Sequence, residues 1–233
     1  MHFFTRLSLL ILLLAISYPG HVLAMDLEGV LDKLIKSYGG EENLRKLDTM
    51  TQQWDVVALM GNRHGTDVRD IRVPDQLRVE LDYQGESETR ILNGNIAYYR
   101  SNVSPASDVT VFQRDAMRLQ LMRLYSPLVL RDKIASVSLT EDGDWLALSL
   151  AEYGVKVHYQ VNRENWRIEK VSGVMSINGN EMQFLTVYSD FAVVEGALLH
   201  HKENKFAGDV NTAVLNLKKV SFDVEFEDSH FVP

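Results

Sequence analysis

The sequence predicts a mainly β protein of the α+β class, built on one long antiparallel sheet. Three stretches, 77–83, 155–161 and 220–226, alternate apolar and polar residues without interruption. Such alternation places one side of a strand in the core and the other in water, which is typical of antiparallel sheets. Turn sequences such as Asn93-Gly94 and Asp142-Gly143 favour tight hairpins. Their spacing predicts about ten or eleven strands in a meander that curls or closes to protect its edges.

The alternation also predicts which side chains point into the core. We expect three apolar residues of these stretches, Leu81, Val157 and Phe222, to be buried. We expect their polar neighbours to be exposed, since successive side chains of a strand point to opposite faces. These neighbours are Glu80, Lys156 and Asp223.

The N-terminal residues 1–24 have the layout of a secretory signal peptide. Arg6 precedes an apolar run over 7–16, Pro19 and Gly20 break that run, and Ala24 is a small residue at the expected cleavage point. The run has about half of the roughly 20 apolar residues that a membrane-spanning helix needs. We therefore expect cleavage after Ala24 and a mature chain, 25–233, that forms a single soluble domain without a transmembrane segment. An uncleaved N-terminal anchor is the less favoured alternative.

The first element of the mature chain is predicted to be an amphipathic helix. Asp26 is placed to cap its start, and Gly39-Gly40 ends it. Its apolar face repeats at helical spacing and consists of Leu27, Val30, Leu31, Leu34, Ile35 and Tyr38. A second short helical turn is expected over 41–47.

A second helix is expected in the middle of the strand order, at about 109–130. Its apolar residues, again at helical spacing, are Met117, Leu121, Leu124, Tyr125 and Leu128. Arg114 and Arg118 lie one turn apart on another side of this helix. Pro127 is expected to end or kink it, because proline interrupts the helical hydrogen-bond ladder.

Composition excludes several classes of function. The chain has no cysteine, and 24 basic against 32 acidic side chains give a net charge of -8, which argues against nucleic-acid binding. No common catalytic or phosphate-binding motif occurs. The adjacent pair His200-His201 is unsuited to one metal ion, because neighbours in a strand point to opposite faces. We therefore predict neither catalytic residues nor a metal or cofactor. A hydrolase with paired carboxylates stays a minor alternative.

Both ends of the mature chain resemble the outer-membrane lipoprotein-sorting superfamily. The resemblance covers the helix end and the sequence that follows it at 38–44, the hairpin formed by 188–191 and 195–202, and the C-terminal tail 226–233. His200 stands where that family commonly has proline. The middle of the chain agrees mainly in the order of its elements.

The resemblance implies a curved, incomplete antiparallel barrel with helices on its concave side. Members of the family carry acyl chains of lipoproteins, bind other lipids or sense envelope stress, and these roles are not enzymatic. We therefore expect a periplasmic binding or carrier protein for an apolar or acylated ligand. A non-enzymatic envelope module with a filled core, which acts through another envelope protein, is the alternative.

A cavity between sheet and helices would need an apolar lining, for which the sequence offers specific candidates. The expected lining residues are Trp54, Val79, Leu81, Met117, Leu121, Leu124, Tyr125, Leu128 and Trp145. Arg114 and Arg118 are the candidates for contact with an anionic head group or a partner. The alternatives are that the apolar stripe is ordinary core and that the arginines form a solvated helix face.

Overall fold

The computed structural model describes residues 26–104, 108–177 and 179–233. The predicted signal peptide and its cleavage site after Ala24 lie outside the described residues, so both stay predictions. Every helix that the structure describes is too short or too polar to cross a bilayer.

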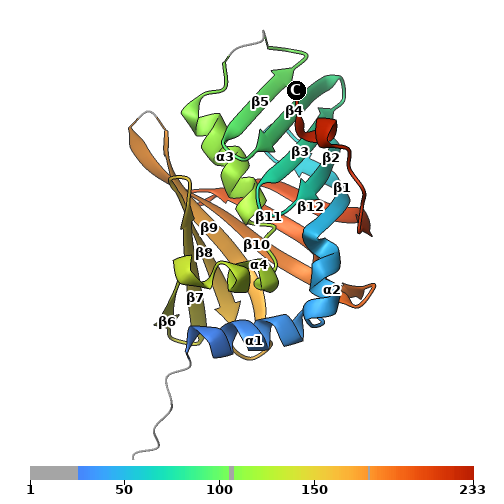
Figure 1. Ribbon diagram of the computed structural model, residues 1–233. Helices are drawn as coiled ribbons and strands as arrows, with labels where there is room; N and C mark the ends of the chain where they lie inside the picture. Colours follow the sequence, from blue (N-terminus) through green and yellow to red (C-terminus); the bar gives the residue numbers. More distant parts are fainter. Residues whose placement is uncertain (1–25, 105–107, 178) are drawn as a thin grey trace, which may run out of the picture.

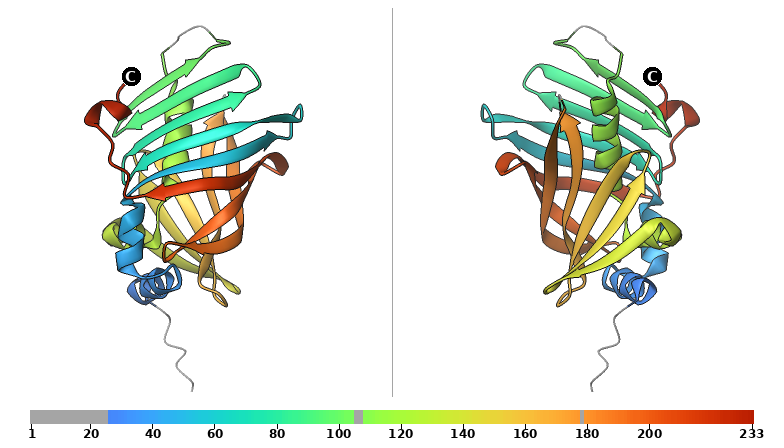
Figure 2. Two further views of the ribbon diagram at one scale, coloured as in Figure 1. Left: turned by 90° about the vertical axis from the view of Figure 1, so that its right-hand side faces the viewer. Right: turned by 90° about the vertical axis from the view of Figure 1, so that its left-hand side faces the viewer.

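The described residues form a 12-stranded sheet in which neighbouring strands are antiparallel. Its order is β5-β4-β3-β2-β1-β12-β11-β10-β9-β8-β7-β6, so β5 and β6 form its two edges. The sheet is strongly curved but does not close into a barrel (Figure 2). This confirms the expected fold class, with slightly more strands than the ten or eleven expected. The strands are β1 (Thr49–Ala58), β2 (Arg63–Arg72), β3 (Gln76–Tyr83), β4 (Glu86–Asn93), β5 (Ile96–Ser101), β6 (Val137–Asp142), β7 (Trp145–Glu152), β8 (Val155–Asn162), β9 (Arg167–Ile177), β10 (Asn180–Val194), β11 (Ala197–Ala207) and β12 (Val210–Phe222).

The helices begin at residues that cap them. Asp26 accepts a hydrogen bond from the backbone N–H of Gly29 at the start of α1, and Thr110 forms a capping box with Gln113 at the start of α3. Pro127 occupies the first turn of α4, where its missing N–H is harmless. The helix expected over 109–130 is therefore two helices. The helical elements are α1 (Leu27–Ser37), α2 (Glu41–Arg45), α3 (Val111–Met122), α4 (Pro127–Asp132) and the 3-10 turns η1 (Lys46–Asp48), η2 (Ile134–Ser136) and η3 (Asp228–Phe231).

The link between the two edge strands crosses the open side of the sheet (Figure 1). The chain leaves the sheet after β5, runs through α3 and α4, and re-enters it at the opposite edge as β6. Helix α3 contacts β3, β4 and β5 on one side and β8 and β9 on the other. We call the face that α3 covers the concave face. Helix α1 packs against α4 and closes one end of the half-barrel (Figure 1).

The main core lies between the concave face and the helices. In β8, Val155, Val157, Tyr159 and Val161 are buried in alternation with partly or fully exposed polar residues. Leu121 and Leu128 of the helices are fully buried against the sheet. Burial of such side chains is worth roughly 1.5–3 kcal/mol each, so the apolar stripe holds the helices in place.

The expected burial pattern holds in the sheet interior and fails near strand ends. Val157 is buried while Glu80 and Lys156 are exposed, as expected. Leu81 and Phe222 are only half-buried. The stretch 220–226 is not one strand, because β12 ends at Phe222 and Asp223 has a φ of 51° as the chain leaves the sheet.

Gly39 holds α1 close to the hairpin between β10 and β11. Its φ is +106°, and a Cβ at this position would lie 1.9 Å from the carbonyl oxygen of Gly196. The next contact is a hydrogen bond from the N–H of Leu198 to the carbonyl of Tyr38, at 3.0 Å. Only glycine fits both the backbone angle and the close approach.

We predict that Gly39→Ala lowers the free energy of unfolding by about 2–4 kcal/mol, from backbone strain together with steric overlap. Gly94→Ala is the control, because Gly94 also has a positive φ, +55°, but open space around it. We expect about 1 kcal/mol at Gly94. Urea unfolding of both variants measures the difference, and equal losses would contradict the close approach at Gly39.

Candidate functional site

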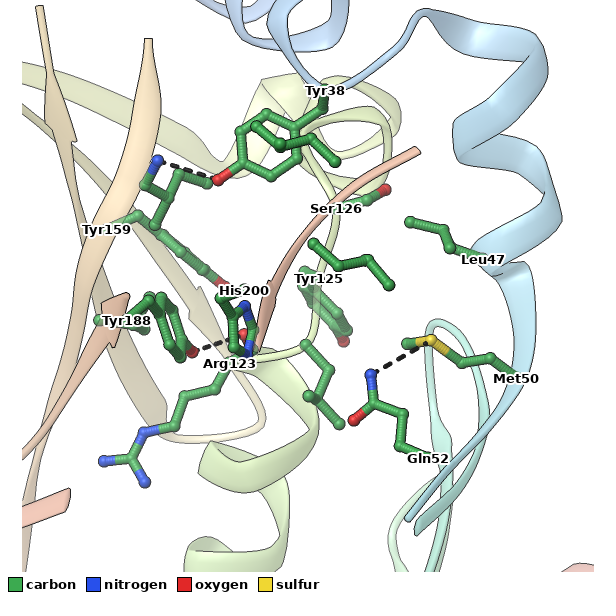
Figure 3. Close-up of a pocket in the computed structure, with 15 residues that line it drawn as sticks. Tyr38, Leu47, Met50, Gln52, Arg123, Tyr125, Ser126, Tyr159, Tyr188 and His200 are labelled. Atoms are coloured by element: carbon green, nitrogen blue, oxygen red, sulfur yellow. Dashed lines mark hydrogen bonds between the residues drawn. The ribbon is translucent and has the colours of Figure 1, made fainter. Parts of the chain in front are cut away.

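A cavity lies where α1, β1 and the α3–α4 junction meet the concave face of β8–β11 (Figure 3). Its volume is about 50 Å³. That space suffices for water molecules, whereas pockets that bind drug-sized ligands measure about 300–1,000 Å³. The lining is mostly apolar, with tyrosines and a few polar groups among the aliphatic side chains. It consists of Tyr38, Leu47, Met50, Gln52, Arg123, Leu124, Tyr125, Ser126, Tyr159, Ile168, Val171, Tyr188, Leu198, Leu199 and His200.

Two tyrosines of the sheet bind the last carbonyls of α3. Tyr159 of β8 donates to the carbonyl of Met122 at 2.8 Å, and Tyr188 of β10 donates to that of Arg123 at 2.9 Å. The last four carbonyls of a helix lack partners within the helix, so these hydroxyls satisfy the C-terminal end of α3. Burial raises the pKa of both hydroxyls, which keeps them protonated as donors.

Tyr125 anchors the other side of the α3–α4 junction. Its hydroxyl lies within hydrogen-bond distance of the carbonyl of Pro74 and, at 3.1 Å, of the Glu152 carboxylate. Burial, together with the negative charge of Glu152, raises the pKa of this hydroxyl. The junction is therefore attached to the sheet by side-chain hydrogen bonds, in contrast to the backbone ladder that joins the strands.

A buried ion cluster lies on the concave face of β2 and β11. Arg69 binds Asp67 at 2.9 Å and Glu203 at 2.8 Å, and all three side chains are almost fully buried. Lys205 lies 3.4 Å from the other oxygen of Glu203. Although burial alone would raise it, the charges of Arg69 and Lys205 hold the pKa of Glu203 well below its usual range. Glu203 therefore stays ionised at neutral pH.

Aromatic rings connect the ion cluster to the cavity. The imidazole of His200 stacks on Tyr188 with centroids 4.0 Å apart and on Trp54 at 5.7 Å. The guanidinium of Arg69 lies 5.0 Å from the centroid of Trp54, a cation–π geometry. Trp54 is fully buried, and its indole N–H donates to Gln52 at 3.0 Å. The interior of the half-barrel therefore combines an apolar part with a polar part.

The expected lining residues fall into four groups. Leu124 and Tyr125 line the cavity. Val79, Met117, Leu121 and Leu128 belong to the main core, and Met117 also borders a groove of about 200 Å³ at the other end of α3. Trp54 and Leu81 pack in a smaller cluster with Val56 and Leu215.

Trp145 forms the fourth group, because it lies on the convex face. The next residues of β7 that are fully buried, Leu146 and Leu148, have the opposite parity along the strand. The indole is half-buried, and the ammonium group of Lys170 lies 5.0 Å from its ring centroid. Trp145 therefore points away from the cavity.

The arginines of the mid-chain helix do not form one surface. Arg114 is exposed and pairs with Asp115 at 3.4 Å. Arg118 is buried, donates to the carbonyl of Gly94 and lies 4.1 Å from the ring centroid of Tyr153. Arg123 enters the interior beside the cavity. Contact of Arg114 or Arg118 with an anionic head group or a partner stays a prediction.

Sequence reasoning missed the polar interior. Asp67, Arg69 and Glu203 occur in stretches that resemble solvated strand faces, and two of them are far from the third in sequence. His200, which the sequence presents only as half of a pair unsuited to a metal ion, lies between the rings of Tyr188 and Trp54. Among the described residues, no group of three histidine, cysteine or acidic side chains is arranged to hold a metal ion.

We predict that Arg69→Met lowers the free energy of unfolding by about 3–5 kcal/mol at pH 7, because Asp67 and Glu203 lose their partner inside the core. Glu203 has a depressed pKa in the folded protein, so its contribution is present above its unfolded pKa and is lost as the pH falls. Without Arg69 the carboxylate of Glu203 protonates more readily, so the difference from the wild type shrinks on acidification. Urea unfolding at pH 7 and pH 4 measures this change.

Arg78→Met is the control for this prediction. Arg78 pairs with Glu80 on the convex face, where the side chains are 25% and 56% exposed. Exposed pairs contribute about 0–1 kcal/mol. A loss at Arg78 as large as that at Arg69 would contradict the assignment of the interior cluster.

Comparison with solved structures supports the fold. A LolA superfamily protein from Nitrosomonas europaea aligns over 88% of this chain and 97% of its own, with a TM-score of 0.59 and 14% identity. A putative outer membrane lipoprotein-sorting protein domain from Vibrio parahaemolyticus aligns over 87% and 94%, with a TM-score of 0.51 and 9% identity. No family model matches the sequence, and no curated protein matches it. The resemblance inferred from the sequence is therefore confirmed for the fold, which is similar to that of these two structures.

Proposed function

We propose that this protein is a periplasmic binding or carrier protein that holds an apolar or acylated ligand between the sheet and the helices. The observation that carries the proposal is the mostly apolar cavity beneath the α3–α4 junction. Burial of methylene groups stabilises a complex by about 0.8 kcal/mol each without any polar motif. Such a ligand can therefore bind to a chain whose sequence contains no catalytic or binding motif.

Ligand entry requires movement of α3 and α4, the helices that cover the concave face and that we call the helical roof. The cavity of about 50 Å³ is closed to an acyl chain, while α3 spans the opening from β3–β5 to β8 and β9. On β9, Gly173 allows α3 to approach closely, because a Cβ there would lie 2.7 Å from Leu119 Cδ1. In the proposal, α3 separates from β9 at this contact and enlarges the cavity.

The small volume favours a second candidate function. An envelope protein-interaction or stress-sensing module needs no internal ligand, and its core would be filled as in this closed state. Such a module acts through its surface on another envelope protein. Mass spectrometry of the purified protein separates the two, because only the carrier is expected to retain lipid.

The absence of cysteine allows a test with one engineered disulfide. We predict that the double variant Leu119→Cys/Gly173→Cys takes up a fluorescent fatty acid when reduced and loses most of that uptake when oxidised. The bridge would hold α3 on β9, because a Cβ at residue 173 would lie 2.7 Å from Leu119 Cδ1, which places it within reach of a cysteine side chain at position 119. Addition of a reductant should restore uptake in the same sample.

Leu119→Cys alone is the control, and it should keep its uptake in oxidant. Equal uptake by the oxidised and reduced double variant would show that α3 does not need to leave β9. If delipidated wild type never takes up the probe across the micromolar range, the carrier function is wrong and the surface-acting module stands.

We also propose that the chain is exported and cleaved after Ala24. N-terminal sequencing of the periplasmic protein should begin at Met25, because Ala24 is a small residue that follows the apolar run. A membrane-retained product that still begins at Met1 would show that the segment is an anchor.

A further inference from the structure

Arg123 and Thr186 place unpartnered polar groups side by side in the interior. The carbonyl of Arg123 accepts the Tyr188 hydroxyl, and its guanidinium donates to the carbonyl of Phe184 at 2.9 Å. Arg123 therefore contacts β10 two residues before and two residues after Thr186, whose side chain is on the same buried face as Tyr188. Neither Nε of Arg123 nor the hydroxyl of Thr186 has a hydrogen-bond partner among the described residues. Buried polar groups almost always have partners, so these two need an explanation.

The charges around this position are unbalanced. Lys205 is the Cα partner of Thr186 on β11, and it shares Glu203 with Arg69, which also binds Asp67. Three cations, Arg69, Arg123 and Lys205, therefore face two carboxylates. Burial, and after it the charge of Arg69, lowers the pKa of Lys205 to about 8. In the described part of the chain the guanidinium of Arg123 binds a backbone carbonyl and no carboxylate. A buried positive charge without a counterion is costly, and a negative group at this position would compensate it.

We infer that Arg123, Thr186 and Lys205 form a binding site for one carboxylate or phosphate group. Their N–H and O–H groups supply charge-assisted hydrogen bonds to such an anion. Arg123 lines the cavity, and its guanidinium extends beyond Tyr188 (Figure 3). The site is therefore suited to the anionic end of an amphiphile whose apolar part occupies the cavity. That ligand class rests on the proposed function, whereas a free anion offers the same chemistry without it.

Arg118 differs from Arg123 in its surroundings. It is also buried with an unpartnered guanidinium nitrogen. The face of Tyr153, 4.1 Å from its guanidinium, stabilises the charge by a cation–π interaction. It donates to the carbonyl of Gly94, between β4 and β5, whereas Arg123 donates to that of Phe184, two residues from Thr186. The site therefore includes Arg123 and excludes Arg118.

The test compares a fluorescent dodecanoic acid with its methyl ester on delipidated protein at pH 7. The wild type should bind the acid at least about tenfold more tightly, since charge-assisted hydrogen bonds are stronger than neutral ones.

Arg123→Gln should abolish this preference. Thr186→Val should reduce it about threefold to fivefold without loss of stability, because the removed hydroxyl has no partner. Arg131→Gln, in an exposed pair with Glu41, is the control and should keep the preference.

A second measurement distinguishes a free anion from the anionic end of an amphiphile. It also tests the anion site separately from the carrier function. Inorganic phosphate, against chloride at equal ionic strength, should raise the Tm of the wild type and leave that of Arg123→Gln unchanged. A shift with phosphate and no binding of acid or ester would keep the anion site and refute the carrier. Equal binding of acid and ester by the wild type would refute the anion site and keep the carrier. Loss of the preference in Arg118→Gln but not in Arg123→Gln would overturn the assignment.

Discussion

The crossing from β5 to β6 is the constraint on which the rest of this structure depends. These strands are the opposite edges of the sheet, so the segment between them has to span the open side. A helix that spans this gap buries side chains against the strands on both sides of it, as α3 does with β3–β5 and with β8–β9. The same helix lies between β3–β5 and β8–β9, on the side where the sheet stays open. The half-open barrel and its helical roof are thus two results of one connection.

This arrangement leaves an interior that one helix cannot fill. Near α1 and α4, aliphatic side chains and tyrosines close the space to a cavity of about 50 Å³. Farther along the concave face, Arg69 extends between Asp67 and Glu203 under the ring of Trp54. Replacement of such ion clusters by apolar side chains is often neutral or stabilising. The cations that Lys205 and Arg123 add to this cluster are therefore consistent with the anion site proposed above.

The sequence predicted elements where local chemistry dominates. Period-two alternation located β8, and Asp26 with Gly39 located the ends of α1, because strands, caps and turns depend on neighbouring residues. The face on which Trp145 lies depends on which parity of β7 faces α3, and a large aromatic residue suits either face. The ion cluster joins β2 to β11, residues 69 and 203, across a separation that no local pattern reveals. In the sequence, its residues resemble an ordinary solvated strand face, because only the curvature of the sheet brings them into the interior.

The closed state and a binding function are compatible in energy. Three tyrosine hydroxyls, of Tyr125, Tyr159 and Tyr188, hold the α3–α4 junction to the rest of the protein. At roughly 1 kcal/mol net for each hydrogen bond, their loss costs about 3 kcal/mol. Burial of about four methylene groups, at about 0.8 kcal/mol each, offsets that cost. The buried apolar contacts of Leu119 and Leu121 add to the cost of moving α3 away from the sheet. In the proposed carrier, therefore, only a ligand with a long apolar chain would open the cavity, and an anionic group bound beside Arg123 would orient that ligand.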